Sequence, residues 1–185
     1  MNRLVIVPEE KHEALAEELK PRLSGIAKEI DANNLAQVMS AQTVALLEDF
    51  SRNSGGRVMI WAREGKSYAI GWISDDTEPS LRGRVRADAG EGMIAMVFES
   101  GRSTSDTAAN LELGEWSNLG ELLDTPVGEM ASSPVHVFGE TAAVVSWVCG
   151  KEGDLPLRAP AEVSALVARL IEDRLIRMSL GFEMA

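Results

Sequence analysis

The chain has 185 residues, of which 45% are hydrophobic and 25% charged, a composition typical of a globular domain. Its 18 basic and 29 acidic side chains give a net charge of −11, which argues against nucleic-acid or anionic-membrane binding, since both need a basic face. The single cysteine, Cys149, allows no intrachain disulfide and no cysteine-based metal cage. We expect a cytoplasmic protein, because the N-terminal apolar run is too short for a signal peptide. We expect neither a cofactor nor a metal site.

The first fifty residues are predicted to be helical. Apolar residues recur every three or four positions from Leu15 to Ile30, and Pro21 divides this run into two short helices. A further helix is predicted to begin at Asn33 or Asn34, which are good N-cap residues. The inner face of that helix is predicted to carry Leu35, Val38, Met39, Gln42 and Leu46. The chain then divides into a helical extension, residues 1–32, and a domain, residues 33–181.

The middle of the chain is predicted to form antiparallel strands. Strands over 57–63 and 67–73 flank the turn signal at 64–66, and a third strand over 81–87 alternates cleanly. A short helix over 93–100 should follow, with Asp88 as its N-cap and Gly101 as its C-terminal stop. Residues 103–130 are predicted to form a long irregular segment with six acidic residues and no basic one.

The last third is predicted to form a second hairpin and a closing helix. Strands over 130–138 and 141–149 are joined by a two-residue turn at Gly139 and Glu140. Pro160 suits the first turn of the helix. Its apolar stripe consists of Val163, Leu166, Val167, Leu170, Ile171, Leu175 and Met178. This order of elements predicts an α+β fold with one antiparallel sheet.

Two segments resemble the GAF domain family. Residues 90–106, GEGMIAMVFESGRSTSD, are similar to its signature, in which a glycine-led helix precedes a short strand ending in aspartate. Residues 130–148, MASSPVHVFGETAAVVSWV, are similar to the paired final strands of the family, and a long closing helix follows. The resemblance covers residues 33–180. It implies a GAF-like six-stranded antiparallel β-sheet with the N- and C-terminal helices packed on one face and a ligand pocket on the other.

The same resemblance implies a function. It points to a small stand-alone GAF-like module, a bacterial-type sensor that is not an enzyme, binds a small molecule and regulates a partner signalling protein. It also implies a homodimer through the terminal helices, whose apolar stripes at 163–178 and 35–46 suit a helix bundle. The alternatives are a ligand-free dimeric scaffold and a redox enzyme of the free methionine-(R)-sulfoxide reductase type. That chemistry uses several cysteines, and this chain has one.

Candidate ligand residues come from the pattern and from the resemblance. Period-two spacing puts Arg82, Arg84 and Arg86 on one face of a strand, where they would suit a small anionic ligand; the alternative is a solvated strand face paired with the acidic segment. The resemblance adds Met93, Met96, Asp106, Trp116, Ser132 and Ser133. For these the structural alternatives are core filling by the methionines, a turn cap at the aspartate and a loop plug at the tryptophan.

No catalytic residue is predicted. The chain has two histidines, His12 and His136, and no Gly-x-Ser-x-Gly nucleophile motif. His136 is interpreted as a residue on a strand face rather than a general base. Cys149 ends an apolar strand, where burial is expected to raise the pKa of its thiol and lower its reactivity.

Overall fold

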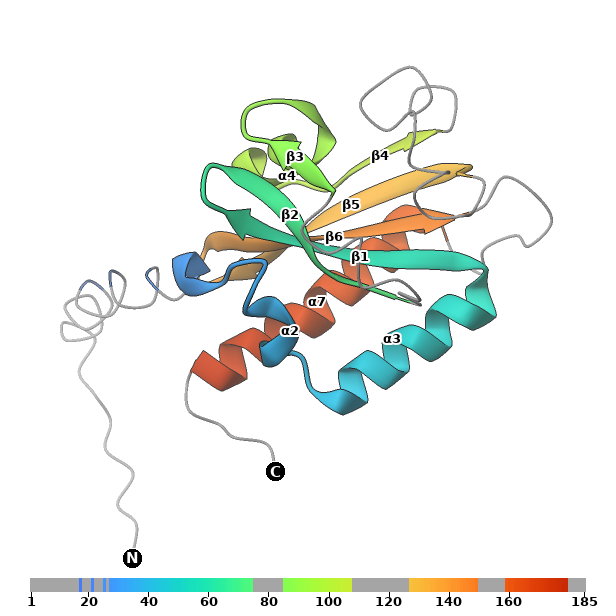
Figure 1. Ribbon diagram of the computed structural model, residues 1–185, viewed down its shortest axis with the longest axis horizontal. Helices are drawn as coiled ribbons and strands as arrows, with labels where there is room; N and C mark the ends of the chain where they lie inside the picture. The colour runs from blue at the N-terminus through green and yellow to red at the C-terminus, as the bar shows by residue number, and fades with distance from the viewer. Residues whose placement is uncertain are drawn as a thin grey trace, which may run out of the picture.

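A computed structural model describes residues 27–74, 85–107, 127–149 and 159–179, together with residues 17, 21 and 25. Four helices and six strands lie wholly within these ranges (Figure 1). The helices are α2 (Leu35–Val38), α3 (Ala41–Ser54), α4 (Gly92–Ser100) and α7 (Pro160–Ser179). The strands are β1 (Gly56–Glu64), β2 (Ser67–Ile73), β3 (Arg86–Asp88), β4 (Thr104–Thr107), β5 (Glu129–Val137) and β6 (Glu140–Cys149).

The six strands form one sheet in the order β3-β2-β1-β6-β5-β4, and every neighbouring pair is antiparallel. The central strands are buried on both faces, so they read as nearly continuous apolar runs rather than as strict alternation. This arrangement confirms the predicted α+β class and the six-stranded antiparallel sheet.

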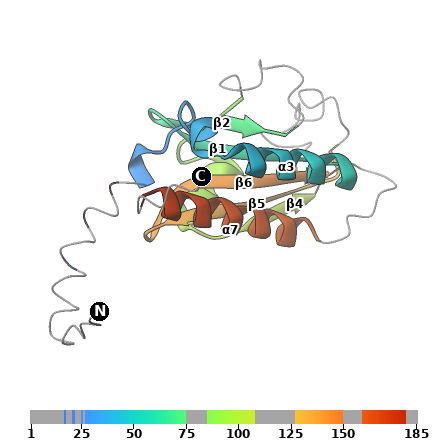
Figure 2. The same cartoon turned by 90° about the horizontal axis from the view of Figure 1, so that it is seen from below.

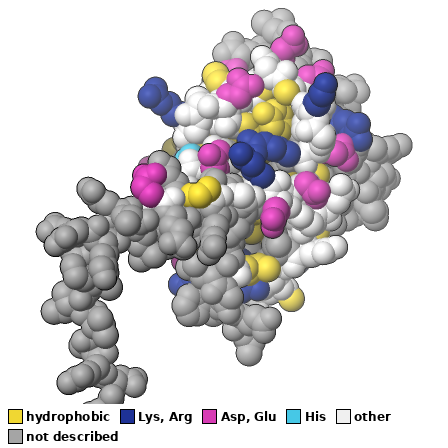
Figure 3. Space-filling view, turned by 90° about the vertical axis from the view of Figure 1, so that its left-hand side faces the viewer, with side chains coloured by type: hydrophobic (Ala, Val, Ile, Leu, Met, Phe, Trp, Pro, Cys, Tyr) yellow, Lys and Arg dark blue, Asp and Glu magenta, His cyan; other side chains and the backbone are white. Residues whose placement is uncertain are grey.

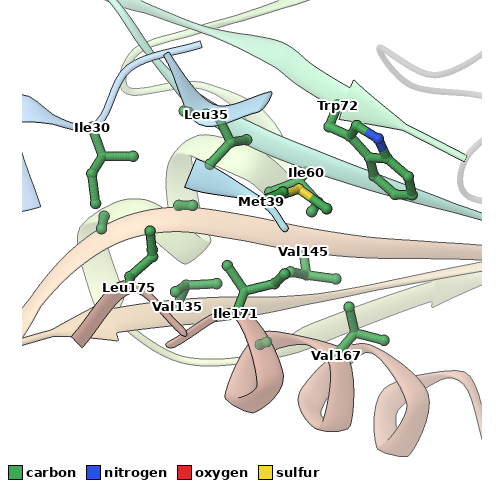
Figure 4. Packing of buried hydrophobic residues seen from close by; sticks show 14 of the residues in the cluster. Ile30, Leu35, Met39, Ile60, Trp72, Val135, Val145, Val167, Ile171 and Leu175 are labelled. Carbon is green, nitrogen blue, oxygen red and sulfur yellow. The ribbon is translucent and has the colours of Figure 1, made fainter. Parts of the chain in front are cut away.

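Helices α2, α3 and α7 pack on one side of this sheet, which we call the back face (Figure 2). Helix α3 lies against β1, whereas α7 lies against β5 and β6. The core beneath them includes Leu35, Ile60, Val145 and Ile171 (Figure 4). The predicted packing of terminal helices on one face is therefore confirmed, and Ile30 joins the same core.

Helix α4 covers the opposite side of the sheet, which we call the front face. A second apolar cluster lies beneath it, built from Ile94 and Val97 of the helix and from Trp61, Met130 and Val144 of the strands. The helix ends as predicted, because Gly101 adopts φ 63° and its N–H donates to the carbonyl of Val97 at 3.0 Å. The sheet thus separates two cores.

The helix predicted to begin at Asn33 or Asn34 is interrupted. Asn34 is the N-cap of α2, but α2 ends at Val38 and a new helix begins after Ser40, whose Oγ accepts a hydrogen bond from the Thr43 N–H at 3.1 Å. The break changes the helical phase. Gln42 and Leu46, predicted on the inner face, are consequently exposed, which corrects that prediction.

Two further predictions about local structure are wrong. Asp88 does not cap the short helix: it lies in β3, and the N-cap position belongs to Glu91. The turn between β5 and β6 consists of Phe138 and Gly139 rather than Gly139 and Glu140. Both turn residues have positive φ, 50° and 86°, as a type I′ hairpin turn requires. The bulge between Val135 and His136 shifts the register just before this turn.

The segment predicted to be irregular over 103–130 contains ordered structure at both ends. Thr104–Thr107 forms edge strand β4, and β5 begins at Glu129. Residues 108–126 lie outside the described residues, as do residues 81–84 of the predicted third strand. No helix in the described ranges is long and apolar enough to span a membrane.

Candidate ligand site on the front face

Polar side chains cross the front face among apolar residues. Strand pairing sets Thr104 opposite Ser132 and Ser132 opposite Ser146. Residues opposite one another in a sheet point to the same face, so the three hydroxyls form a row across β4, β5 and β6. Ser132 and Ser146 are completely buried. Buried hydroxyls need hydrogen-bond partners, and the partners here define the site.

These partners form a chain of hydrogen bonds. The Trp61 Nε1–H donates to Ser146 Oγ at 3.1 Å, the two serine oxygens lie 2.7 Å apart, and Ser132 Oγ donates to Met93 Sδ at 3.3 Å. An indole N–H only donates and a thioether only accepts. Because the single Ser132 proton goes to sulfur, Ser146 must donate to Ser132. We call this series, Trp61 to Ser146 to Ser132 to Met93, the donor chain.

The donor chain ends under the first turn of α4. Met93 is the second residue of that helix and is 9% exposed. Gly90 and Gly92, just before it, have φ of 84° and 78°, a region that glycine enters without strain. An open depression of about 620 Å³ lies on the outer side of α4. It is lined by the two glycines and by Met96, Glu99 and Ser100. Gly92, at the rim of the depression, therefore directly precedes Met93, the last residue of the donor chain, in the sequence.

The two predicted methionines have different surroundings. Met93 points into the sheet and accepts the Ser132 hydrogen bond. Met96 is 50% exposed and lines the depression on the outer side of the helix. The predicted serines Ser132 and Ser133 lie on opposite faces of the sheet. Ser133 faces the back, where its Oγ lies 2.8 Å from the Oγ of Ser164 in α7.

The remaining predicted ligand residues lie away from the donor chain or outside the described residues. Asp106 pairs with Met130, so it lies on the front face two residues from Thr104, and it is half-buried. Arg86 is exposed, and its Nη2 lies 2.7 Å from Glu64 Oε2, close enough for an ion pair although not aligned as a hydrogen bond. Trp116 and Arg84 lie outside the described residues.

Arg86 also points away from the front core. Its neighbour Ala87 is buried in the front cluster, and successive side chains of a strand point to opposite faces. The surface at this end of the molecule carries charges of both signs around an apolar area (Figure 3). Acidic and basic side chains are thus interspersed on this side of the molecule.

An aromatic pair closes the front core near the β1–β2 hairpin. The rings of Tyr68 and Phe98 are stacked, with centroids 4.1 Å apart, and the Arg63 guanidinium lies 5.7 Å from the Phe98 centroid. Burial raises the pKa of the Tyr68 phenol, with Arg63 lowering it and Glu99 raising it. The phenol therefore stays protonated at neutral pH, and this pair acts as a packing element at the edge of the site.

The lone cysteine is placed as the sequence predicted. Cys149 ends β6, is 9% exposed, and its Sγ lies 3.6 Å from the Glu129 carbonyl oxygen, to which it donates. Burial raises the pKa of its thiol, and the Glu129 carboxylate raises it further. A protonated thiol is a poor nucleophile. No other cysteine exists in the sequence to resolve a sulfenic acid on the same chain.

His136 faces no nucleophile that the described contacts identify. Its backbone N–H donates to Glu172 Oε2 at 3.2 Å, and its ring lies where a side chain on Gly101 would have to fit. It is a half-buried residue of β5, as the sequence analysis predicted. Among the described ranges, no three acidic, histidine or cysteine side chains come together in a metal-binding arrangement.

Sequence reasoning missed two members of the donor chain, Trp61 and Ser146. A signal for Ser146 is present, because it is the only polar residue inside the apolar run 142–149. A hydroxyl in a strand buried on both faces must have a partner. Trp61 gives a weaker signal, because its position in a buried strand does not reveal where the indole nitrogen points.

No protein family model and no curated protein matches the sequence. Solved structures do match the fold. The GAF domain of a two-component sensor histidine kinase from Bacillus halodurans has a TM-score of 0.57 and 11% identity, over 78% of this chain and 99% of that one. The GAF domain of a phosphoenolpyruvate-protein phosphotransferase from Coxiella burnetii has a TM-score of 0.55 and 14% identity, over 89% and 99%. This chain has the GAF fold.

One GAF-fold neighbour is an enzyme. A type II free methionine-R-sulfoxide reductase from Thermoplasma acidophilum matches with a TM-score of 0.54 and 12% identity, over 78% of this chain and 94% of that one. Identities this low establish the shared fold and leave function to be argued from the site. In this GAF fold the candidate site is the donor chain and the surface of α4 above it.

Proposed function

We propose that this GAF-fold protein is a non-enzymatic sensory module that binds a small molecule beneath α4 and regulates a partner protein. The observation that carries the proposal is the donor chain, in which two fully buried hydroxyls and an indole N–H line up within an apolar core next to a glycine-flanked helix. Apolar walls with a few convergent polar groups are typical of small-molecule sites. The protonated thiol of Cys149 argues against the redox alternative.

Native mass spectrometry of the purified full chain tests this proposal. The expected result is a mass excess of a few hundred daltons or less that is lost after unfolding and refolding. A thermal-shift panel of metabolites on the refolded protein should then restore the original midpoint. A chain that carries no small molecule, and that no metabolite of a broad panel stabilises, contradicts the sensory function.

The second candidate function is a ligand-free scaffold, and one observation favours it. The described part of the front core is filled by the protein's own side chains, among them Met59, Ile94 and Met130, which are essentially inaccessible to solvent. A scaffold of this kind would give no ligand in the mass measurement but would still assemble. Partner capture with wild-type protein and with a front-core variant would then give the same result.

Both candidate functions include a homodimer through the terminal helices. The back helices expose large apolar side chains, Leu46 of α3 at 56%, Leu166 of α7 at 55% and Leu170 at 39%. Beside Leu170, Asp173 pairs within α7 with Arg177, whose Nε lies 2.8 Å from the carboxylate, so part of the charge around the leucines is already neutralised. An exposed apolar surface of this kind suits a two-fold contact with a second copy.

A further inference from the structure

The donor chain ends on an acceptor that is weaker than the donors before it. Three donors point in series toward Met93 Sδ, and hydrogen bonds in such a series strengthen one another in a dry interior. A thioether sulfur is a weak acceptor, whereas a carbonyl or sulfoxide oxygen is a strong one. The position of Met93 Sδ is thus better suited to oxygen than to the sulfur that occupies it.

We propose that Met93 is a built-in occupant of an acceptor subsite, and that the ligand is a small uncharged molecule whose compact oxygen acceptor displaces the Met93 thioether from Ser132. This inference rests on the proposed sensory function and names the chemistry of its ligand. The subsite consists of the Ser132 hydroxyl, polarised through Ser146 by the Trp61 N–H. In the structure described here the methionine side chain takes the place of the ligand.

The charge of the ligand follows from the surroundings of the subsite. No ionisable side chain belongs to the donor chain, and burying an unpaired charge in an apolar core is costly. The charged side chains on this face lie at its rim: Asp106 is two residues along β4 from Thr104, and the Arg63 guanidinium lies 5.7 Å from the Phe98 centroid. Arg86 is paired with Glu64 and faces away. The site therefore selects a neutral acceptor, which departs from the anionic ligand that the arginine row suggested.

Met93 has a place to go when it is displaced. The depression on the outer side of α4 is lined by Gly90 and Gly92, the residues that precede Met93. Methionine is unbranched and has three rotatable side-chain bonds, but Met93 points into the sheet and the depression lies on the outer side of α4, so its exit also requires the first turn of the helix to move. The positive φ values of both glycines also allow the start of α4 to adjust. Ligand binding and exit of the methionine side chain are then one exchange.

The test compares three probes of similar size on the full chain: dimethyl sulfoxide, dimethyl sulfide and methanesulfonate. The first has an uncharged oxygen acceptor, the second only a thioether, and the third is an anion. Met93→Ala removes the occupant, and Met96→Ala is the matched control, because Met96 lies on the same helix but outside the donor chain. Binding is measured by NMR titration of the indole N–H of Trp61, assigned with Trp61→Phe.

In Met93→Ala we expect dimethyl sulfoxide to bind about tenfold more tightly than dimethyl sulfide, the ratio that one neutral hydrogen bond gives. Methanesulfonate should not bind. Adding Ser132→Ala should abolish the preference for the sulfoxide without abolishing sulfide binding. The inference is overturned if the sulfoxide and the sulfide bind equally, if the anion binds best, or if Met96→Ala reproduces the effect.

A second measurement needs no cavity variant, in case Met93→Ala fails to fold. In wild-type protein labelled at the methionine methyl groups, saturating dimethyl sulfoxide should move the Met93 resonance toward that of a solvent-exposed methionine and leave Met130 unchanged. A Met93 resonance that does not respond overturns the displacement step. Failure of the sensory function is recognised separately: the probes would bind as expected, but no metabolite would co-purify with the wild-type chain.

Discussion

The direction of the donor chain predicts how serine substitutions combine. Ser146→Ala removes the acceptor of the Trp61 N–H, and that group can only donate. A buried donor left without a partner costs about 1–3 kcal/mol, so we expect the free energy of unfolding to fall by about 2 kcal/mol. Ser132→Ala leaves the Ser146 hydroxyl proton without its acceptor, and we expect a loss of about 1–2 kcal/mol for the same reason.

The double variant should not show the sum of these losses. When both serines are alanine, the Trp61 N–H has lost its Ser146 acceptor, just as in Ser146→Ala alone. The predicted loss is therefore about 2 kcal/mol, and the coupling between the two positions is about 1–2 kcal/mol. Two positions without a shared partner would instead give additive losses.

Urea unfolding followed by circular dichroism measures these free energies. The matched control cycle combines Ser132→Ala with Ser51→Ala, because the buried Ser51 hydroxyl bonds to Ser74 and shares no hydrogen-bond partner with Ser132. That cycle should be additive to within about 0.5 kcal/mol. The reasoning is refuted if the Ser132 and Ser146 losses are also additive within that limit.

Three more predictions concern other parts of the molecule. Leu170→Glu should convert the proposed dimer to a monomer at micromolar concentration by native mass spectrometry, whereas Met96→Glu on the front should not. Gly56→Ala should lower the free energy of unfolding by about 1–3 kcal/mol, because its new methyl would lie 2.3 Å from the buried indole of β6; Gly25→Ala, with nothing within 4 Å, should not lower it. Since the pKa of Cys149 is raised, thiol alkylation should require a higher pH than for free cysteine, and an ordinary alkylation profile would contradict the burial argument.

Sequence periodicity identified most of the fold, because both hairpins and the closing helix have strong local signals. The pair at 57–63 and 67–73 differs from β1 and β2 by at most one residue at an end. Errors arose where two local signals compete. Asp88 is a good helix cap, yet pairing with Ser67 holds it in β3, and tertiary pairing outweighs the preference for a cap.

The apolar stripe predicted for the closing helix has the correct period but includes residues that do not face the sheet. Val163, Val167 and Ile171 are buried against the sheet, whereas Leu166 and Leu170 lie on the outer side. One face of a helix on a sheet covers only part of its circumference, so a wide stripe indicates either a deeper core or a second contact. The sequence could not separate these two cases, and the exposure of the leucines supports a second contact.

The candidate site was predicted only in part because hydrogen bonds between distant strands leave no pattern in the sequence. Ser132 and Met93 were found from the resemblance, and they are 39 residues apart. Trp61 and Ser146 are 85 residues apart, and their bond depends on the order of strands in the sheet. A single sequence gives alternation within each strand but not which strands are neighbours.

The alternation of β5 links the two faces of the sheet. Ser132 is the last hydroxyl of the donor chain on the front, and the next residue, Ser133, bonds to Ser164 of α7 on the back. Ser164 Oγ donates to the Ala161 carbonyl at 3.2 Å, so Ser133 must donate to Ser164, and the contact has one fixed direction. A shift of Ser132 as the methionine leaves would therefore reach α7 through a single peptide unit.

This link predicts that front-face binding alters the back helix. In the wild-type protein, saturating dimethyl sulfoxide should change hydrogen exchange along α7, and Ser164→Ala should reduce that change while leaving probe binding intact. If exchange in α7 does not respond to a bound probe, the two faces are energetically independent. The regulated surface would then have to be α4 itself, because that helix directly covers the donor chain.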